Sequence, residues 1–433
     1  MIARVKLGEV VTLSQGFAVN AKSKHLMSDS GLPLLRITDL INNTKSQYLT
    51  EETAPEKCIA HEEEIIYTRT GQVGLVFRGK NGVVHNNCFK VIPDANKIGP
   101  DYLYWFLRQP QIKVHANNIA SGSVQKDLNH SAFKSIEIDL LPIEAQSECT
   151  KILNQIENKI SNNTAMNATL EKIAQRIFKS WFVYFDPVKA NEEGVPFDGL
   201  SPEIQALFPN EFEESELGMI PKGWEVKSIG DVAEVTKGKS YKSTELKPSQ
   251  TALVTLKSFQ RGGGYRLDGY KEYIGKYKES QVVENGDLII AYTDMTQAAD
   301  VIGKPAMITG NDQYEKLVIS LDVGVVQPLQ KNLKNYLYGL AMTDNFINHT
   351  KSFTSGTTVL HLGKDAVPTY KFALPSEELL NKYQQISNSL FEKISLNIIQ
   401  NSCLTKLRDK LLPRLISGKI TIQKAEELLE EAS

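Results

Sequence analysis

Two stretches of the chain arrange apolar and polar residues in the same helical pattern. Residues 156–163 read IENKISNN and residues 390–397 read LFEKISLN, an offset of 234 positions (390 − 156). From each stretch, apolar or amide side chains recur at every seventh residue, which predicts a coiled-coil seam. The seam comprises Ile156, Asn163, Leu170 and Ile177 in the first copy, and Leu390, Asn397, Leu404 and Leu411 in the second.

Each predicted helix has a start signal. Pro142 and Pro375 can begin a helix because the missing N–H costs nothing there, and acidic Glu144 and Glu377 suit a helix N-terminus. The first helix would run from about residue 143 to 180, roughly 55 Å at about 1.5 Å per residue. Part of a second seam row is predicted at Met166, Ile173, Ile386 and Leu407, with interruptions at Lys159, Lys393 and Gln400.

Two interpretations of these helices remain open. Each helix can pack on its own domain, or the two copies can pair in antiparallel orientation, which would give the chain an internal pseudo-twofold axis. In the paired arrangement, Asn163 and Asn397 would form a polar contact that sets the register. Otherwise these two side chains face solvent at a local break.

The repeat extends beyond the helices at the same offset. YLYW (102–105) matches YLYG (336–339), ASGSV matches TSGTT (354–358), and TLEKIAQRIF (169–178) matches CLTKLRDKLL (403–412). The intervening segments contain short apolar runs such as EEIIYT (63–68) and GDLIIAYT (286–293), punctuated by Gly and Asn. We therefore predict a mixed α/β (α+β) fold with two globular domains separated by two long antiparallel helices.

Composition supports a multidomain globular protein. The chain has 433 residues, of which 41% are hydrophobic, which exceeds one ordinary core. No run of 18 apolar residues predicts a membrane span, and the charged start MIARVKLGEV lacks a signal-peptide core, so we expect a cytoplasmic protein. The four cysteines, which form no CxxC pair, are expected to be reduced and mostly buried: Cys58, Cys88, Cys149 and Cys403.

The net charge of −2 hides an uneven distribution. Residues 186–217 contain one lysine and nine acidic residues, so the rest of the chain is mildly basic. That bias is only weak support for nucleic-acid binding.

Sequence motifs of common enzymes are missing. KGKS (237–240) resembles a phosphate-binding loop, but Ala233 stands where that pattern requires glycine. The seven histidines show no metal-ligand spacing, and neither GxSxG nor the adenine-methyltransferase motif (D/N)PP(Y/F) occurs. The sequence therefore favours a non-catalytic protein.

Three long motifs then carry a resemblance to a known family. FKSWFVYFDPVKANEEG, LFPNEFEESELGMIPKGWEV and LLPRLISGKI resemble stretches of the specificity subunit of type I restriction-modification systems, and the order of the repeats is similar across essentially the whole chain. The resemblance implies five segments: target recognition domain 1 (1–143), conserved helical region 1 (144–184), an acidic linker (185–217), target recognition domain 2 (218–375), and conserved helical region 2 with a C-terminal tail (376–433).

The resemblance also implies partners. Each recognition domain would read one half of a split site on double-stranded DNA, while the helices set the spacing and dock two methylation subunits. Those subunits methylate adenine with S-adenosylmethionine, and restriction subunits cut unmodified DNA using ATP. We expect no cofactor on this chain, with S-adenosylmethionine, ATP and Mg²⁺ on the partner subunits, and no contact with a membrane.

Polar loops supply the candidate DNA contacts, because such side chains can bond both phosphates and base edges. In the first domain they are Arg69, Thr70, Gln72, Ser121, Ser123, Gln125 and Lys126. In the second domain they are Lys237, Lys239, Tyr241, Thr293, Thr296, Gln297, Ser355, Thr357 and Thr358.

Two other functions compete with this interpretation. The duplicated coiled coil could belong to a protein-interaction scaffold that does not read DNA. A stand-alone DNA methyltransferase is the second rival, although the chain lacks its cofactor motifs.

Overall fold

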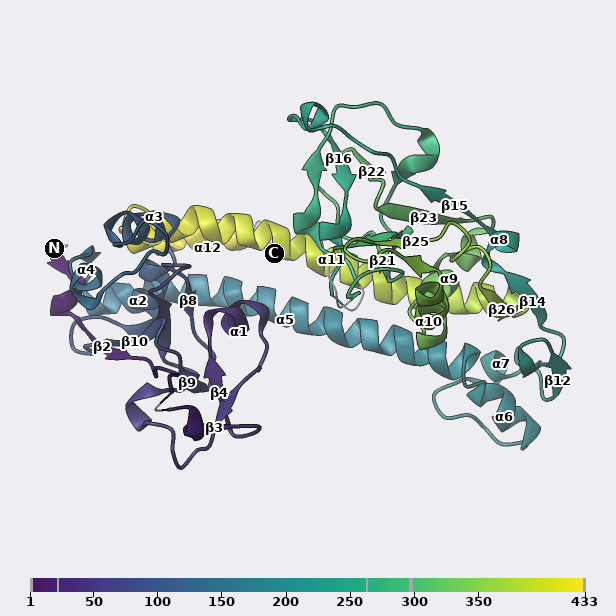
Figure 1. The fold of residues 1–433 in the computed structure, drawn as a ribbon, viewed down its shortest axis with the longest axis horizontal. Coiled ribbons are helices and arrows are strands. Elements are labelled where there is room, and N and C mark those ends of the chain that lie inside the picture. Colours follow the sequence, from purple (N-terminus) through teal and green to yellow (C-terminus); the bar gives the residue numbers. More distant parts are fainter. Residues whose placement is uncertain (1–2, 22, 262–263, 296–298, 431–433) are drawn as a thin grey trace. The chain divides into compact units, whose positions relative to one another are not determined.

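The structure is a computed structural model that describes residues 3–21, 23–261, 264–295 and 299–430. The chain forms two compact units, each of which contains segments distant in the sequence. Unit 1 consists of residues 1–160 and 402–433, and unit 2 consists of residues 161–401. The long helices α5 (Ile143–Phe182) and α11 (Glu377–Ile416) each contribute residues to both units (Figure 1).

Each unit contains a four-stranded antiparallel sheet with the same strand order. In unit 1 the order is β2-β10-β7-β8, and in unit 2 it is β15-β23-β19-β21. The strands of unit 1 are β2 (Val11–Gln15), β7 (Ile65–Thr68), β8 (Val76–Phe77) and β10 (Cys88–Pro93). Those of unit 2 are β15 (Ala233–Lys237), β19 (Leu288–Ala291), β21 (Pro305–Met307) and β23 (Val323–Pro328).

A second sheet also recurs, although the sequences that form it differ. The order β5-β4-β9-β6 in unit 1 corresponds to β17-β16-β22-β18 in unit 2, and the central pair is parallel in both. In unit 1, β3 extends this sheet. Its strands are β3 (Met27–Ser28), β4 (Leu32–Leu35), β5 (Tyr48–Leu49), β6 (Ile59–Ala60), β9 (Gly82–Val84), β16 (Thr251–Val254), β17 (Lys271–Glu272), β18 (Val282–Val283) and β22 (Lys316–Ile319).

Short strand pairs and helices complete the units. The strand pairs are β1 (Ala3–Lys6) with β11 (Glu137–Leu140), β14 (Glu225–Ser228) with β26 (Lys371–Leu374), and β12 (Phe212–Ser215) with β13 (Gly218–Pro221). Unit 1 has α1 (Ile37–Asn42), α2 (Pro100–Leu107), α3 (Pro110–Ile119), α4 (His130–Lys134) and α12 (Ile422–Glu430). Unit 2 has α6 (Asp186–Glu192), α7 (Pro202–Gln205), α8 (Ile229–Val232), α9 (Lys334–Ala341) and α10 (Asp344–Ser352).

Matched tyrosines connect the helices of each unit to its sheets. The Tyr102 hydroxyl donates to the Asp139 carbonyl oxygen, and the Tyr336 hydroxyl donates to the Ala373 carbonyl oxygen, each at 2.9 Å. Both residues of the second pair lie 234 positions after those of the first. The repeat therefore preserves a specific polar contact as well as the order of elements.

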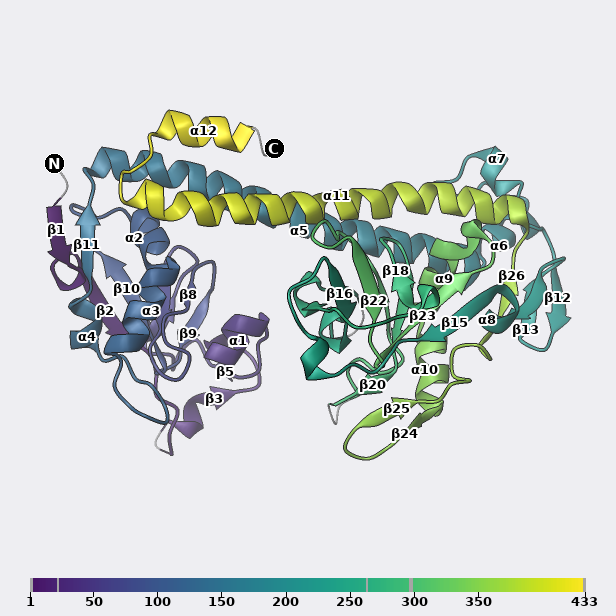
Figure 2. The ribbon, with the colours of Figure 1, turned by 90° about the horizontal axis from the view of Figure 1, so that it is seen from above.

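The acidic segment between the halves is ordered by aromatic packing. Phe208 is buried in the unit 2 core, and Phe212 packs against that core. Trp181 of α5 meets the Phe208 ring edge-on, with 5.2 Å between the ring centroids. In unit 1, α12 follows α11 in the chain and buries Ala425 in the core of unit 1 (Figure 2).

The two long helices begin one and two residues after the prolines that were expected to start them. Among the predicted seam residues, Ile156, Asn163, Asn397, Leu404 and Leu411 are buried, while Leu170, Ile177 and Leu390 are partly buried. Heptad packing therefore occurs in both units, along the part of each helix that belongs to that unit.

The predicted second seam row is wrong in α5. Met166 and Ile173 are 43% and 39% exposed. Ile386 and Leu407 are partly buried, each against the core of its own unit. The residues four positions after the first row turn inward instead, as Ile160, Asn167 and Ala174 show by their burial. The heptad pattern alone does not distinguish the +3 from the +4 neighbours, because both flank the same face.

Four asparagines join the helices inside unit 2. Asn163 Nδ2 donates to Asn401 Oδ1 at 2.9 Å, and Asn397 Nδ2 donates to Asn167 Oδ1 at 2.8 Å. Because 163 and 397, like 167 and 401, are 234 apart, the two bonds are related by the internal repeat. Their numbering runs in opposite directions along the two helices, which makes this pair antiparallel. The predicted fold class is thereby confirmed, and Asn163 and Asn397 do not face solvent.

Candidate nucleic-acid interface

The two candidate loops of the first domain meet at a carboxylate. Arg69 Nη2 lies 2.6 Å from Asp127 Oδ2, and Thr70 Oγ1 donates to Asp127 Oδ1 at 2.6 Å. Backbone bridges join Asp127 to both Thr70 and Ser121. The loop after β7 and the turn from residue 121 to 127 therefore form one surface.

Arg69 has a second partner on β2, which β10 separates from β7 in the sheet. Its Nη1 donates to Gln15 Oε1 at 3.0 Å, and Gln15 Nε2 donates in turn to the Asn86 carbonyl oxygen at 2.7 Å. Partial burial would raise the pKa of the Asp127 carboxyl, but the hydrogen bonds from Arg69 and Thr70 outweigh it and lower the pKa below its ordinary value. The carboxylate therefore stays ionised and holds the guanidinium at neutral pH.

In each unit, a glycine directly after the edge strand β2 or β15 allows a close backbone approach at the strand-end surface. A Cβ on Gly16 would lie 2.3 Å from the His85 carbonyl oxygen, and one on Gly238 would lie 2.1 Å from that of Ser320. Neither position tolerates a side chain without backbone movement. The motifs SQG and TKG thus mark equivalent strand ends.

In unit 2 the matching strand ends carry different chemistry. Lys237 Nζ lies 4.7 Å from the centroid of the Tyr292 ring, a cation–π contact. Thr293 is buried and donates to Asp322 Oδ1 at 2.8 Å. The loop after β19 again meets a hairpin, because β20 (Thr293–Asp294) pairs with β25 (Leu360–Leu362) and β25 pairs with β24 (Thr354–Ser355).

That hairpin projects from unit 2 on the side opposite α11 (Figure 2). Ser355, Thr357 and Thr358 lie on it and are exposed.

The KGKSY stretch is divided between two sites. Lys237 points to the strand-end surface, whereas Lys239 Nζ donates to the Lys276 carbonyl oxygen at 2.7 Å. The Tyr241 hydroxyl accepts from Lys271 Nζ at 2.6 Å, beside the second sheet. Lys239 and Tyr241 therefore contact the segment around β17, away from Thr293.

Most of the remaining candidates are exposed. In unit 1 these are Gln72, Ser121, Ser123, Gln125 and Lys126. Thr296 and Gln297 lie outside the described residues. The role of each candidate in DNA contact stays a prediction. Lys239 and Tyr241 do not lie at the strand-end surface of their unit.

Sequence reasoning missed several residues of these surfaces. Gln15, Asp127, Asp322 and His361 take part through side-chain or backbone contacts. Asp127 directly follows the predicted loop, and Gln15 precedes a glycine just as Lys237 does, so alignment of the two halves could have identified both. Val124 is fully exposed and Met295 is 77% exposed at loop tips, where apolar contact with a thymine methyl group is chemically available.

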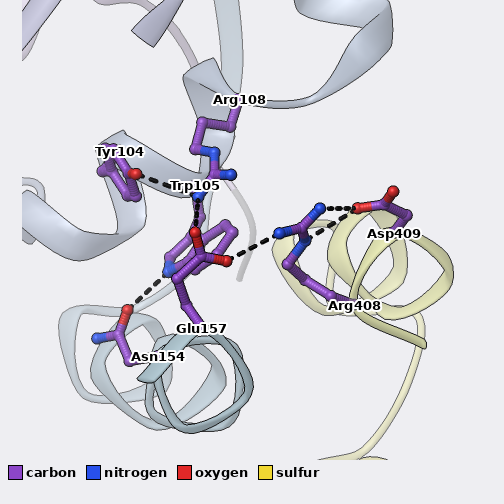
Figure 3. Close-up of polar contacts among 7 residues, drawn as sticks. All are labelled: Tyr104, Trp105, Arg108, Asn154, Glu157, Arg408 and Asp409. Carbon is purple, nitrogen blue, oxygen red and sulfur yellow. Dashed lines mark hydrogen bonds and ion pairs between the residues drawn. The ribbon is translucent and has the colours of Figure 1, made fainter. Parts of the chain in front are cut away.

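The domain–helix junction of unit 1 contains a second charged cluster (Figure 3). Glu157 of α5 lies between Arg108 and Arg408, with O–N distances of 3.1 and 2.8 Å. The Arg108 guanidinium also stacks 4.7 Å from the Trp105 ring centroid. Burial would raise the pKa of Glu157, but the two arginines outweigh burial and lower it. This cluster attaches α2 and its flanking residues to the helices of that unit.

Neither surface has the side chains of a metal or redox centre. Among the described residues, no group of three or more His, Cys, Asp or Glu side chains could hold a metal ion. Cys58, Cys88 and Cys149 are buried free thiols, and Cys403 is exposed. Across the same residues, no helix is long and apolar enough to cross a membrane.

Comparison with known proteins covers most of the chain. The family described as type I restriction modification DNA specificity domain matches twice, over residues 2–172 and 221–403. The MjaIX specificity subunit of the type I restriction enzyme of Methanocaldococcus jannaschii is 25% identical, covering 96% of this chain and 93% of the relative. The HindI specificity subunit of Haemophilus influenzae is also 25% identical, covering 78% of this chain and 82% of the relative.

A solved structure shows the same fold. The crystal structure of the type I restriction-modification S subunit from M. genitalium superposes with a TM-score of 0.57 at 14% sequence identity, and 96% of each chain is covered.

Proposed function

Because this chain belongs to the family of type I restriction-modification DNA specificity subunits, we propose that its two recognition domains read the two halves of a split DNA site. Members of the family are the non-catalytic components that give the complex its sequence specificity. One observation carries the proposal furthest: both units repeat the same strand order, yet their strand ends present different side chains. Two similar folds with different reading surfaces suit two unrelated half-sites.

The long helices would set the spacing between the half-sites and dock two methylation subunits. Two observations support this role: the antiparallel asparagine contacts in unit 2 and the matched Tyr102 and Tyr336 contacts. A buried polar contact between helices favours one register over its alternatives. A fixed register is what a spacer requires.

Catalysis would reside on other subunits. The chain would supply DNA recognition, the methylation subunits would hold S-adenosylmethionine, and the restriction subunits would use ATP and Mg²⁺. The complex would work in the cytoplasm, where it meets the DNA. Restriction and methylation subunits are the partners that this family implies.

A gel-shift experiment with the complete complex tests the proposal. The wild-type chain with its methylation subunits is expected to retain some duplexes of a randomised pool and not others. Equal retention of all duplexes would favour the interaction scaffold without DNA readout. Binding of S-adenosylmethionine by the purified chain would instead favour a stand-alone methyltransferase.

A further inference from the structure

The loops that follow β7 and β19 have the same framework in the two units. Tyr67 and Tyr292 are buried at the strand ends, and Thr68 and Thr293 follow them. In each unit the loop meets a hairpin whose bridge joins a serine to a residue six positions later, Ser121 to Asp127 and Ser355 to His361. Because both units share these features, they belong to the fold that the two units have in common.

The side chains that follow the framework differ. Arg69 comes after Thr68, whereas Asp294 comes after Thr293 and accepts the Val301 N–H at 2.8 Å. His361 holds the place of Asp127. Unit 2 thus builds the same loop–hairpin contact without an Arg–Asp pair. The Arg69–Asp127 pair is therefore not something that the shared fold requires.

The fixed guanidinium keeps donors available. A guanidinium has five N–H donors, and Gln15 and Asp127 each take one from a different terminal nitrogen. One N–H remains on each terminal nitrogen, and an arginine can donate two N–H groups to O6 and N7 of guanine. The Nε N–H is buried and has no hydrogen-bond partner. The side chain is 21% exposed, beside the exposed loop residues Gln72 and Gln125.

The neighbouring carboxylate argues against a simple phosphate contact. Phosphate binding depends on unneutralised positive charge, whereas Asp127 at 2.6 Å neutralises Arg69. Base reading depends on donor geometry, and the two fixed partners restrict the rotamers of a long side chain before DNA arrives. The arrangement suits readout of a base edge better than attraction to the backbone.

We propose that Arg69 reads a guanine in the half-site bound by the first domain, with Gln15 and Asp127 as positioning residues. This inference rests on the proposed function and names one chemical group that the first domain recognises. The second domain, which has Lys237 at the strand end and Asp294 after the threonine, reads its half-site by other contacts.

The test is selection of bound duplexes from a randomised pool by the complete complex, followed by sequencing. Arg69→Lys keeps the charge and removes the paired donors, so preference for guanine at one position is expected to fall on the order of 10- to 100-fold. Asp127→Asn is expected to weaken the preference at that same position by a smaller factor. The other half-site should be unchanged in both variants.

Arg78→Lys is the matched control, because Arg78 is an ion-paired arginine of similar exposure whose partner is Asp101. It should select the wild-type sequences. An equal loss on all duplexes for Arg69→Lys would reduce Arg69 to a phosphate contact, and unchanged selection would make the pair structural; either result overturns the inference. Should Arg69→Lys fail to fold by thermal melting, Asp127→Asn decides by the same criterion.

Selection by the wild-type complex distinguishes failure of the inference about Arg69 from failure of the proposed function. Sequence selection by the wild type together with unchanged selection by both variants overturns the inference alone. Absence of any selection by the wild type overturns the proposed function and the inference with it.

Discussion

At the scale of single residues, the two halves differ in how a domain is attached to the long helices. Glu157 lies between two arginines in unit 1, whereas its repeat-related residue, Phe391, packs edge-on against Tyr338 in unit 2, with ring centroids 5.5 Å apart. Arg408 corresponds to Ala174. One junction is therefore ionic and the other aromatic.

The ionic junction makes the stability of unit 1 depend on pH. Because the pKa of Glu157 is lowered in the folded state, its contribution is present above the ordinary carboxyl pKa and is lost as pH falls through the lowered value. Glu157→Gln should cost about 1–2 kcal/mol at pH 7, a discounted figure because the side chain is 36% exposed. Thermal melting at pH 7 and at a series of successively lower pH values measures this.

The matched control for that variant is Glu148→Gln, an exposed residue on the same helix. It should leave the melting temperature unchanged at every pH of the series. A destabilisation by Glu157→Gln that stays equally large across the whole series would show that the ion pairs are not its cause.

Residue roles were the hardest feature to predict from the sequence. The loops around Arg69 and Thr293 could be selected because polar residues follow strong strand signals. Their partners are not evident from the loop sequences themselves, since Gln15 and Asp127 are brought to Arg69 from segments more than 50 positions away. Only alignment of the two halves points to them. Burial of Thr293 likewise depends on Asp322, which lies beyond two intervening strands.

At the scale of elements, the long helices were predictable because their heptads repeat at a constant offset. The face of α5 that turns inward was not, and Met166 and Ile173 are exposed as a result. The asparagines in the seam are a specific feature, because a buried amide in an apolar row reduces stability unless it finds a hydrogen-bond partner, as Asn163 and Asn397 do on the opposite helix.

The asparagine contacts predict that the stability of the helix pair and its register can be changed separately. Asn163→Leu alone should cost about 1–3 kcal/mol, because Asn401 Oδ1 and Gln400 Oε1 both lose the Asn163 donor. The double variant Asn163→Leu with Asn401→Leu should regain part of that loss, because the Asn401 acceptor is removed as well and only Gln400 Oε1 still lacks the Asn163 donor. Its complex should nevertheless methylate sites with altered spacers.

Thermal melting and methylation of oligonucleotides with varied spacers measure the two effects. The single variant serves as the control for loss of stability. A double variant that accepts only the wild-type spacer would show that these asparagines do not set the register.

At the scale of the whole molecule, the duplication organises the fold more completely than the sequence indicates. Residues 17–60 and 241–285 share little sequence, yet they contribute strands to sheets of matching order. Strand order depends on burial and pairing, which many sequences satisfy, so a sequence comparison loses it. The motifs around the helices kept their similarity and made the family recognisable.

The spacer role predicts a quantitative effect of shortening both helices. Asn163 bonds Asn401 and Asn167 bonds Asn397, so residues 164–170 lie opposite residues 394–400. Deleting both heptads keeps the seam and the Asn163–Asn401 contact, and removes about 10 Å of helix. At about 3.4 Å per base pair, the preferred spacer should shorten by about 3 base pairs.

Methylation by the complete complex of DNA duplexes with spacers of different lengths measures this change in preferred spacer. Deleting only residues 164–170 is the control, and it should abolish activity because the paired helices become unequal. An unchanged spacer preference after the paired deletion would rule out the helices as the element that sets spacing.

The proposed function is that this chain gives a methylating complex its split DNA specificity. Mapping methylated adenines across the host genome, with and without this chain, is the decisive test of that function. We expect methylation within one motif made of two unrelated parts separated by a fixed spacer, and its loss when the chain is removed. Methylation that persists without the chain, or that follows a single undivided motif, would contradict the account.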